Sequence, residues 1–184
     1  MTVLELCDLA ELNDDARQAA ASGLPVRTYI EQIVRAGQVR VAISALAQVL
    51  PKRDAIAWGL DSIRYVDLAM AKAGAASVVE AIEKWIVEPC DERRRATKDA
   101  AEKAGIATPA GCLGMAVFFS GGSVAPPDSL VTPEPAPNIC GKMVAGAIAL
   151  AVALDPRTAP ERLRGFFDHG MRVANQLKIW EKEG

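Results

Sequence analysis

The sequence has few of the residues on which catalytic and metal sites depend. It holds one histidine, His169, and aromatic residues make up 5% of the chain. His169 lacks an orienting partner nearby, because adjacent residues such as Asp168 do not face each other on a helix. No hydrolase, metalloprotease or phosphate-binding motif occurs. The cysteines are too widely spaced for a zinc framework; they are Cys7, Cys90, Cys112 and Cys140. We therefore expect no metal, no cofactor and no enzymatic activity.

A strong charge of either sign and a long hydrophobic run are also absent. Lysine and arginine number 21 against 23 acidic residues, and the net charge of −2 provides no field to attract nucleic acid. The longest apolar run, residues 143–154, is shorter than the roughly 20 residues that span a bilayer. The N-terminus lacks the pattern of a signal peptide. We expect a cytoplasmic protein with buried, reduced cysteines, no membrane insertion and no nucleic-acid partner.

What the sequence does contain favours helices. Alanine, the strongest helix former, occurs 33 times, and proline and glycine separate segments with helical spacing of apolar residues. No segment alternates with the period of a strand. We predict an all-α fold, a single compact bundle of about eight to nine helices with one long proline-rich loop. The longest helix is expected over 51–74, at the centre of the bundle. Within one domain, 1–184, we divide the chain into N-terminal helices (1–23), main helices (24–119), the loop (120–137) and C-terminal helices (138–184).

The loop is the most unusual segment of the chain. The stretch "FFSGGSVAPPDSLVTPEPAPN", residues 118–138, holds five of the eleven prolines behind a Gly121-Gly122 pair. Proline cannot continue a helix or sit in a central strand, and connections are normally about 4–6 residues long. A loop of this length either crosses the outside of the bundle as a plain connection or serves as a recognition element. Proline-rich segments suit recognition because they lose little entropy on docking.

Several charged residues could form a site, but each has a structural explanation. Residues 93–95 are three arginines flanked by acidic residues, which is typical of a solvated, salt-bridged helix face. Asp61 and Arg64 lie three residues apart on the expected central helix and can pair with each other. The functional alternative is a polar groove lined by Lys52, Arg53, Asp61 and Arg64.

The three tryptophans, Trp58, Trp85 and Trp180, are best explained as core or half-buried packing residues. One of them could instead anchor an interface, because tryptophan is enriched at binding hot spots.

Three stretches resemble an uncharacterised bacterial family that is associated with gene neighbourhoods of the type VI secretion system. They are "AISALAQVLPKRDAIAWGLDSIR", "AIEKWIVEPCDERRRATKDAAEKAG" and "TPAGCLGMAVFFSGGSVAPP". Shared features are Leu50-Pro51, the Trp85 helix with its Glu88-Pro89 turn, the helix start at 108–111 and the loop at 120–127. The sequence departs from the family at Ala57, where a second tryptophan is expected. The resemblance covers residues 24 to 175 and implies a context but no established activity.

From these observations we expect a non-enzymatic, protein-binding accessory protein, an adaptor or chaperone, of a bacterial secretion system, with type VI implied by the resemblance. Its partner would be a secretion component or an effector, bound in a helix groove bordered by the loop. An immunity protein that neutralises an effector is one alternative, and a small-molecule-binding or enzymatic domain using the Asp61/Arg64 region is another. The sequence leaves open whether the chain forms a homo-oligomer. The expected partner-binding residues are Gly121, Gly122, Pro126, Pro127, Trp58, Arg53 and Arg64.

Overall fold

The computed structural model describes residues 1–20 and 23–182. Throughout this part of the chain the regular structure is helical, with eleven α-helices, one 3-10 helix and no strand, so the predicted all-α class is confirmed. The helices are α1 (Val3–Leu9), α2 (Asp14–Ala20), α3 (Val26–Arg35), α4 (Val39–Val49), α5 (Lys52–Arg64), α6 (Asp67–Met70), α7 (Ala75–Val87), α8 (Asp91–Ala104), α9 (Pro109–Phe118), α10 (Ile139–Ala153), α11 (Ala159–Gln176) and η1 (Ile179–Lys182).

The helix expected over 51–74 is wrong in its length, and this is one reason why the helices outnumber the prediction. It ends at Arg64, and Val66 adopts an extended backbone with φ −107° and ψ 98° before the four residues of α6. The side chain of Val66 is fully buried, so the chain leaves the helix where an apolar residue can enter the core. Gly74 precedes α7 as its N-cap residue, and its φ of +79° is a conformation that glycine adopts without steric cost.

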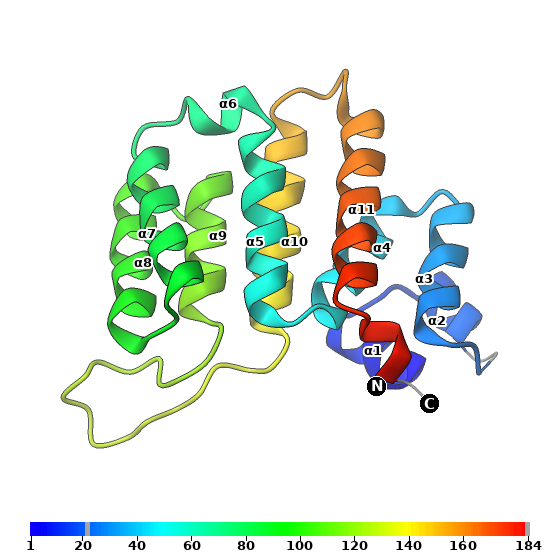
Figure 1. The fold of residues 1–184 in the computed structure, drawn as a ribbon, viewed down its shortest axis with the longest axis horizontal. Coiled ribbons are helices and arrows are strands. Elements are labelled where there is room, and N and C mark those ends of the chain that lie inside the picture. The colour runs from blue at the N-terminus through cyan, green and yellow to red at the C-terminus, as the bar shows by residue number, and fades with distance from the viewer. Residues whose placement is uncertain (21–22, 183–184) are drawn as a thin grey trace.

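The helices form a row in which sequence neighbours are often spatial neighbours. Figure 1 shows α7, α8 and α9 on one side, α5 and α10 in the middle, and α11, α4 and α3 toward the other side. Helix α10 packs against α9, α5 and α4. Most of its residues are small or apolar, so it can lie in the interior of the molecule. Among the described residues, no helix is both long and apolar enough to cross a bilayer.

Close approach of α9 to α7 and α8 depends on Gly114. A Cβ atom at this position would lie 2.9 Å from Val78 Cγ1 and 3.0 Å from Ala101 Cβ, so only glycine fits without displacement. These three helices therefore form one tightly packed unit, and the loop begins at the end of α9.

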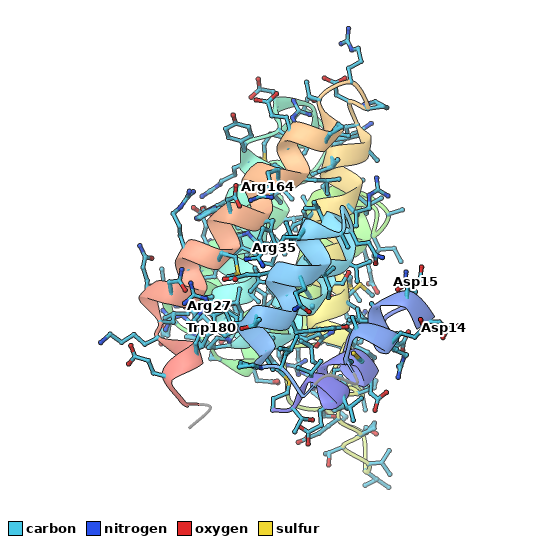
Figure 2. All side chains as sticks on the ribbon, turned by 90° about the vertical axis from the view of Figure 1, so that its right-hand side faces the viewer. Asp14, Asp15, Arg27, Arg35, Arg164 and Trp180 are labelled. Atoms are coloured by element: carbon cyan, nitrogen blue, oxygen red, sulfur yellow. The ribbon has the colours of Figure 1, made fainter. Side chains whose placement is uncertain are left out.

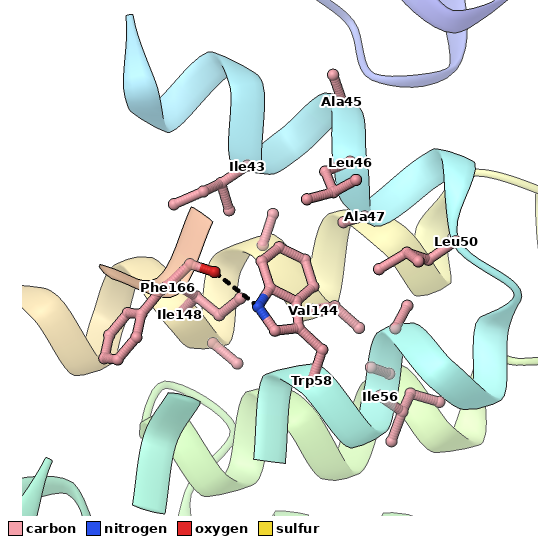
Figure 3. Packing of buried hydrophobic residues seen from close by; sticks show 14 of the residues in the cluster. Ile43, Ala45, Leu46, Ala47, Leu50, Ile56, Trp58, Val144, Ile148 and Phe166 are labelled. Atoms are coloured by element: carbon pink, nitrogen blue, oxygen red, sulfur yellow. Dashed lines mark hydrogen bonds between the residues drawn. The ribbon is translucent and has the colours of Figure 1, made fainter. Parts of the chain in front are cut away.

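Trp58 lies in the centre of the molecule and does not reach the surface. It is 1% exposed, and its indole Nε1 donates a hydrogen bond to the Phe166 carbonyl of α11 at 2.9 Å. Figure 3 shows the indole between α4, α5, α10 and α11, with Leu46, Val144 and Ile148 around it. Trp58 therefore ties α5 to α11 as a packing residue, and its expected place in a partner-binding surface is not found.

The other two tryptophans also pack as expected. Trp85 is 6% exposed, whereas Trp180 is half-buried and donates to Asn175 Oδ1 at 2.9 Å. Figure 2 shows Trp180 near the end of the molecule formed by α3 and α11, while Asp14 and Asp15 point outward from the first turn of α2.

All four cysteines are free thiols, and three of them are buried. Burial raises the pKa of both Cys112 and Cys140 to about 11, so these thiols stay protonated and unreactive near neutral pH. Cys90 is exposed, contrary to the prediction, because it precedes the first turn of α8 and lies outside the apolar face of that helix.

Candidate functional site

The proline-rich loop leaves the end of α9 and returns to the start of α10, and Figure 1 shows it extending beyond the ends of the neighbouring helices. Its two limbs are joined by one backbone hydrogen bond, from the Val124 amide to the Pro133 carbonyl at 2.9 Å. A second bond, from the Ser129 amide to the Pro126 carbonyl at 3.0 Å, closes a turn near the tip. These two hydrogen bonds therefore define the backbone path of the loop.

Arg94 of α8 holds the start of this loop. Its guanidinium donates to the Phe118 carbonyl at 2.6 Å and to the Ser123 carbonyl at 2.8 Å. It also lies over the Phe118 ring, 5.0 Å from the centroid, where a cation–π attraction adds to the hydrogen bonds. Arg94 is only 4% exposed, so these contacts form where water competes little with them.

Arg95, the next residue of α8, also donates hydrogen bonds to the loop. It donates to the Ala125 carbonyl at 2.8 Å and to the Ser123 carbonyl at 3.1 Å. Asp91 orients both arginines, since its Oδ1 accepts from Arg94 and its Oδ2 accepts from Arg95 at 2.7 Å. We call Asp91, Arg94 and Arg95 the loop clamp.

Lys52, the first residue of α5, adds a third cation at the base of the loop, where its Nζ donates to the Ser120 carbonyl at 2.8 Å. A loop rich in proline has carbonyl groups that no helix or sheet partner satisfies, and buried carbonyls need donors. The loop clamp and Lys52 supply charged donors to the carbonyls of Phe118, Ser120, Ser123 and Ala125. This accounts for the fixed position of the loop base.

The four loop residues predicted to bind a partner occupy two different environments. Gly122 has φ +66°, and a Cβ there would lie 3.3 Å from both Arg94 Nη2 and Asp91 Oδ1, so glycine permits the chain to turn against the clamp. Gly121 faces open space. Pro126 and Pro127 follow the last clamped carbonyl and are exposed. They therefore begin the outer part of the loop.

Two aliphatic side chains mark the tip of the loop. Leu130 is fully exposed and Val131 is 67% exposed, and they are adjacent in sequence. No polar contact holds Leu130, and the Val131 amide donates only to Ser129 Oγ at 3.3 Å. The loop therefore combines a base fixed by charged hydrogen bonds with an apolar tip in solvent.

The predicted residues of α5 do not gather beside the loop. Arg53 is exposed in the first turn of α5, next to Lys52 and thus at the end of the helix that meets the loop. Arg64 is in the last turn, about 16 Å away along the helix axis. It pairs with Glu83 of α7 at 2.5 Å, so the predicted Asp61–Arg64 ion pair is wrong. Asp61 faces α11 instead, where its Oδ2 lies 3.8 Å from His169 Nε2.

The prediction of a solvated, salt-bridged arginine face over 93–95 is confirmed for the ion pairs, since Arg94 and Arg95 both pair with Asp91, but it is wrong about solvation for Arg94, which is buried. Arg93 fits it, with a surface ion pair to Glu88 at 2.6 Å, and Arg95 is partly exposed but also contacts the loop. The sequence did carry a usable signal. Asp91, Arg94 and Arg95 have the i, i+3 and i, i+4 spacing of one helix face, and a loop full of proline elsewhere in the chain needs charged donors.

The loop clamp predicts a specific pH dependence for the Asp91→Asn variant. Hydrogen bonds from Arg95 and then Arg94 lower the pKa of Asp91 below its ordinary value of 3.8. A lowered folded-state pKa means that the stabilisation is complete above the unfolded-state value and is lost as pH falls through the folded-state value. We expect the parent to be more stable than Asp91→Asn by a constant margin from pH 7 to about pH 5, and the margin to shrink below about pH 4. Urea titrations of both proteins across this range measure it. A margin independent of pH down to pH 2 would contradict the role given to the Asp91 charge.

In the described part of the chain, no three His, Cys, Asp or Glu side chains gather in a way that could hold a metal ion. The comparisons with known proteins point to a family whose function is unknown. A family model described as "Family of unknown function (DUF6931)" matches residues 29–174, nearly the extent of the sequence resemblance. No curated protein and no solved structure matches the chain.

Proposed function

Since the chain belongs to the family of unknown function DUF6931, whose description names no activity, we propose a function from its own surface. We propose that it is a non-enzymatic accessory protein that binds another protein through the tip of the loop at 120–137. The observation that carries the proposal is the contrast within the loop. Three cationic side chains fix its base, while Leu130 and Val131 stand in solvent at its tip.

Single exposed aliphatic residues are common on protein surfaces and by themselves need no explanation. The loop differs because its conformation is already restricted by prolines and by charged hydrogen bonds from α5 and α8. Ordering a loop on binding costs free energy, and a loop ordered in advance avoids most of that cost. Full burial of a leucine or valine side chain contributes roughly 1.5–3 kcal/mol. A fixed loop with two such residues therefore suits insertion into an apolar pocket of a partner.

We propose a protein of a bacterial secretion system as the partner, with the type VI system implied by the sequence resemblance. In that setting the chain acts in the cytoplasm as an adaptor or chaperone for a secretion component or an effector. The acidic residues of the loop, Asp128 and Glu134, flank the aliphatic tip, so the complementary surface would be an apolar pocket with a basic rim.

The experiment is affinity purification of the tagged protein from its native bacterium, read by mass spectrometry, with three forms of the chain. They are the parent, the tip variant Leu130→Asp/Val131→Asp, and the control variant Val87→Asp/Ile106→Asp. The control changes two aliphatic residues that are also exposed, 77% and 57%, but lie outside the loop. We expect a secretion component to be recovered with the parent and the control and to be lost with the tip variant.

Binding measurements with that component in purified form give the size of the loss in affinity. Loss of two aliphatic contacts should weaken binding at least about thirtyfold, or about 2 kcal/mol, in isothermal titration calorimetry. The proposal fails if no secretion component is recovered with the parent, or if the tip variant recovers it as well as the control does. Protection of cells against a toxic effector, with no effect on export, would instead support the immunity alternative.

A further inference from the structure

A second candidate site lies at the other end of α5, between that helix and α11, which pack against each other (Figure 1). The loop meets α5 at Lys52, whereas this groove is lined by Asp61 in the last turn of α5 and by Tyr65, the residue after that helix. The groove has a volume of about 540 Å³, within the roughly 300–1,000 Å³ of small-molecule sites. Nothing in the proposed protein-binding function uses it.

Arg162 of α11 lines the groove as a cation without a counterion. Its Nη1 is buried and has no hydrogen-bond acceptor, and its side chain makes no ion pair within the described part of the chain. A buried guanidinium nitrogen without an acceptor is costly, since proteins usually satisfy such donors. An anionic group bound in the groove that Arg162 lines would supply a counterion for the guanidinium charge, and a carboxylate is the planar anion that best matches a guanidinium.

The remaining charges limit which anion fits. Arg172 adds a second cation to the lining, but Asp61 and Glu161 add two carboxylates, and His169 faces Asp61 at 3.8 Å. The two arginines and the two carboxylates balance. A ligand with several negative charges, such as a polyphosphate, would meet stronger repulsion from Asp61 and Glu161 than a single carboxylate at Arg162.

The apolar part of the groove is aromatic. Phe166 lines it, and the Tyr65 ring packs edge-to-face against the Phe166 ring, with ring centroids 5.9 Å apart and planes at 88°. Tyr65 is 73% exposed, so much of its ring is free for contact. Gly165 of α11 lines the same groove, and a Cβ there would meet no atom within 4 Å, which leaves room above the helix backbone. A flat ring can stack or pack edge-on in such a space.

We propose that this groove binds a small monocarboxylate with an aromatic or flat apolar body. The carboxylate pairs with Arg162, and the body lies against Tyr65, Phe166 and the open backbone at Gly165. This site is independent of the loop, so its failure and that of the proposed protein-binding function are separate results.

The test uses phenylacetate as the probe, with phenylacetamide as its neutral analogue and phenyl phosphate as a dianion, in two-dimensional NMR of the full chain. We expect phenylacetate to shift the amide signals of Tyr65, Gly165 and His169 with a saturable dependence on concentration. The amide and the phosphate should bind at least about tenfold more weakly, because they lose the charged pair or meet the two carboxylates.

Two variants of α11 distinguish binding at Arg162 from nonspecific attraction of the anion to arginine residues. Arg162→Met should weaken phenylacetate binding about tenfold or more, while Arg164→Met should leave it unchanged. Arg164 pairs with Asp168 at 3.1 Å and lies on the face of α11 toward α3, near Arg27 and Arg35 (Figure 2). The proposal is overturned if no probe shifts these signals, if the acid and the amide bind equally, if the phosphate binds more tightly, or if both variants lose binding alike. The tip variant of the loop should bind phenylacetate as the parent does.

Discussion

Replacement of Gly170 by alanine is expected to lower the free energy of unfolding by about 2–3 kcal/mol, in the range of overpacked cores. A Cβ at this position of α11 would lie 2.7 Å from both Leu46 Cδ2 and Trp58 Cε2. The leucine methyl can move, but the indole cannot easily do so. Trp58 is enclosed by four helices, and its Nε1 is bonded to the Phe166 carbonyl of the same helix α11. Relief of the clash therefore costs either that hydrogen bond or the packing of α11 on α5.

Gly165, five residues earlier in α11, is the matched control. A Cβ there meets nothing within 4 Å, so Gly165→Ala should raise the free energy of unfolding by about 0.5–1 kcal/mol through helix propensity alone. Urea denaturation of both variants measures the contrast, and thermal unfolding should show Gly170→Ala lower by roughly 4–12 °C. Equal changes of the same sign in the two variants would show that the contact between Gly170 and Trp58 is not a fixed feature of the core.

The helical class and most helix ends were predictable because they depend on local chemistry. Proline and glycine mark the ends of α3, α4, α8 and α9 in the sequence as they do in the structure. The break after Arg64 was not predictable in the same way, since no proline or glycine stands between Arg64 and Met70. There the burial of Val66 in the tertiary core decides, and the helix propensity of the segment yields to it.

In the candidate site, too, the features set by local sequence were predictable and those set by tertiary packing were not. The loop itself follows from its prolines, and Pro126 and Pro127 are exposed in it. What holds the loop could not be predicted from spacing alone, because Arg94 is separated from Phe118 and Ser123 by 24 and 29 residues. Arg64 and Trp58, in contrast, were expected beside the loop but lie away from it. Both lie on the same helix as Lys52, but helix rotation directs Trp58 into the core, and helix length carries Arg64 to the far end of α5.

The second large effect is expected from Arg94→Met, which keeps an unbranched apolar side chain but removes the guanidinium with its charge and donors. The carbonyls of Phe118 and Ser123 lose their bonds at 2.6 Å and 2.8 Å, and the Phe118 ring loses its cation. Hydrogen bonds to charged groups contribute about 1.5–3 kcal/mol each, and Arg95 retains one contact to Ser123. We expect the free energy of unfolding to fall by about 2–3 kcal/mol in urea titrations.

The matched control is Arg93→Met, whose side chain makes a surface ion pair with Glu88 and one bond to the Lys84 carbonyl, for an expected loss of at most about 1 kcal/mol. Hydrogen exchange of the Val124 amide then separates loop release from global destabilisation, because this amide bonds to Pro133 across the two limbs. Arg94→Met should speed its exchange relative to amides of α10, while Arg93→Met should not. If Val124 exchanges at the parent rate in Arg94→Met, the base of the loop is held by other contacts, and preorganisation of the Leu130–Val131 tip by the loop clamp is refuted.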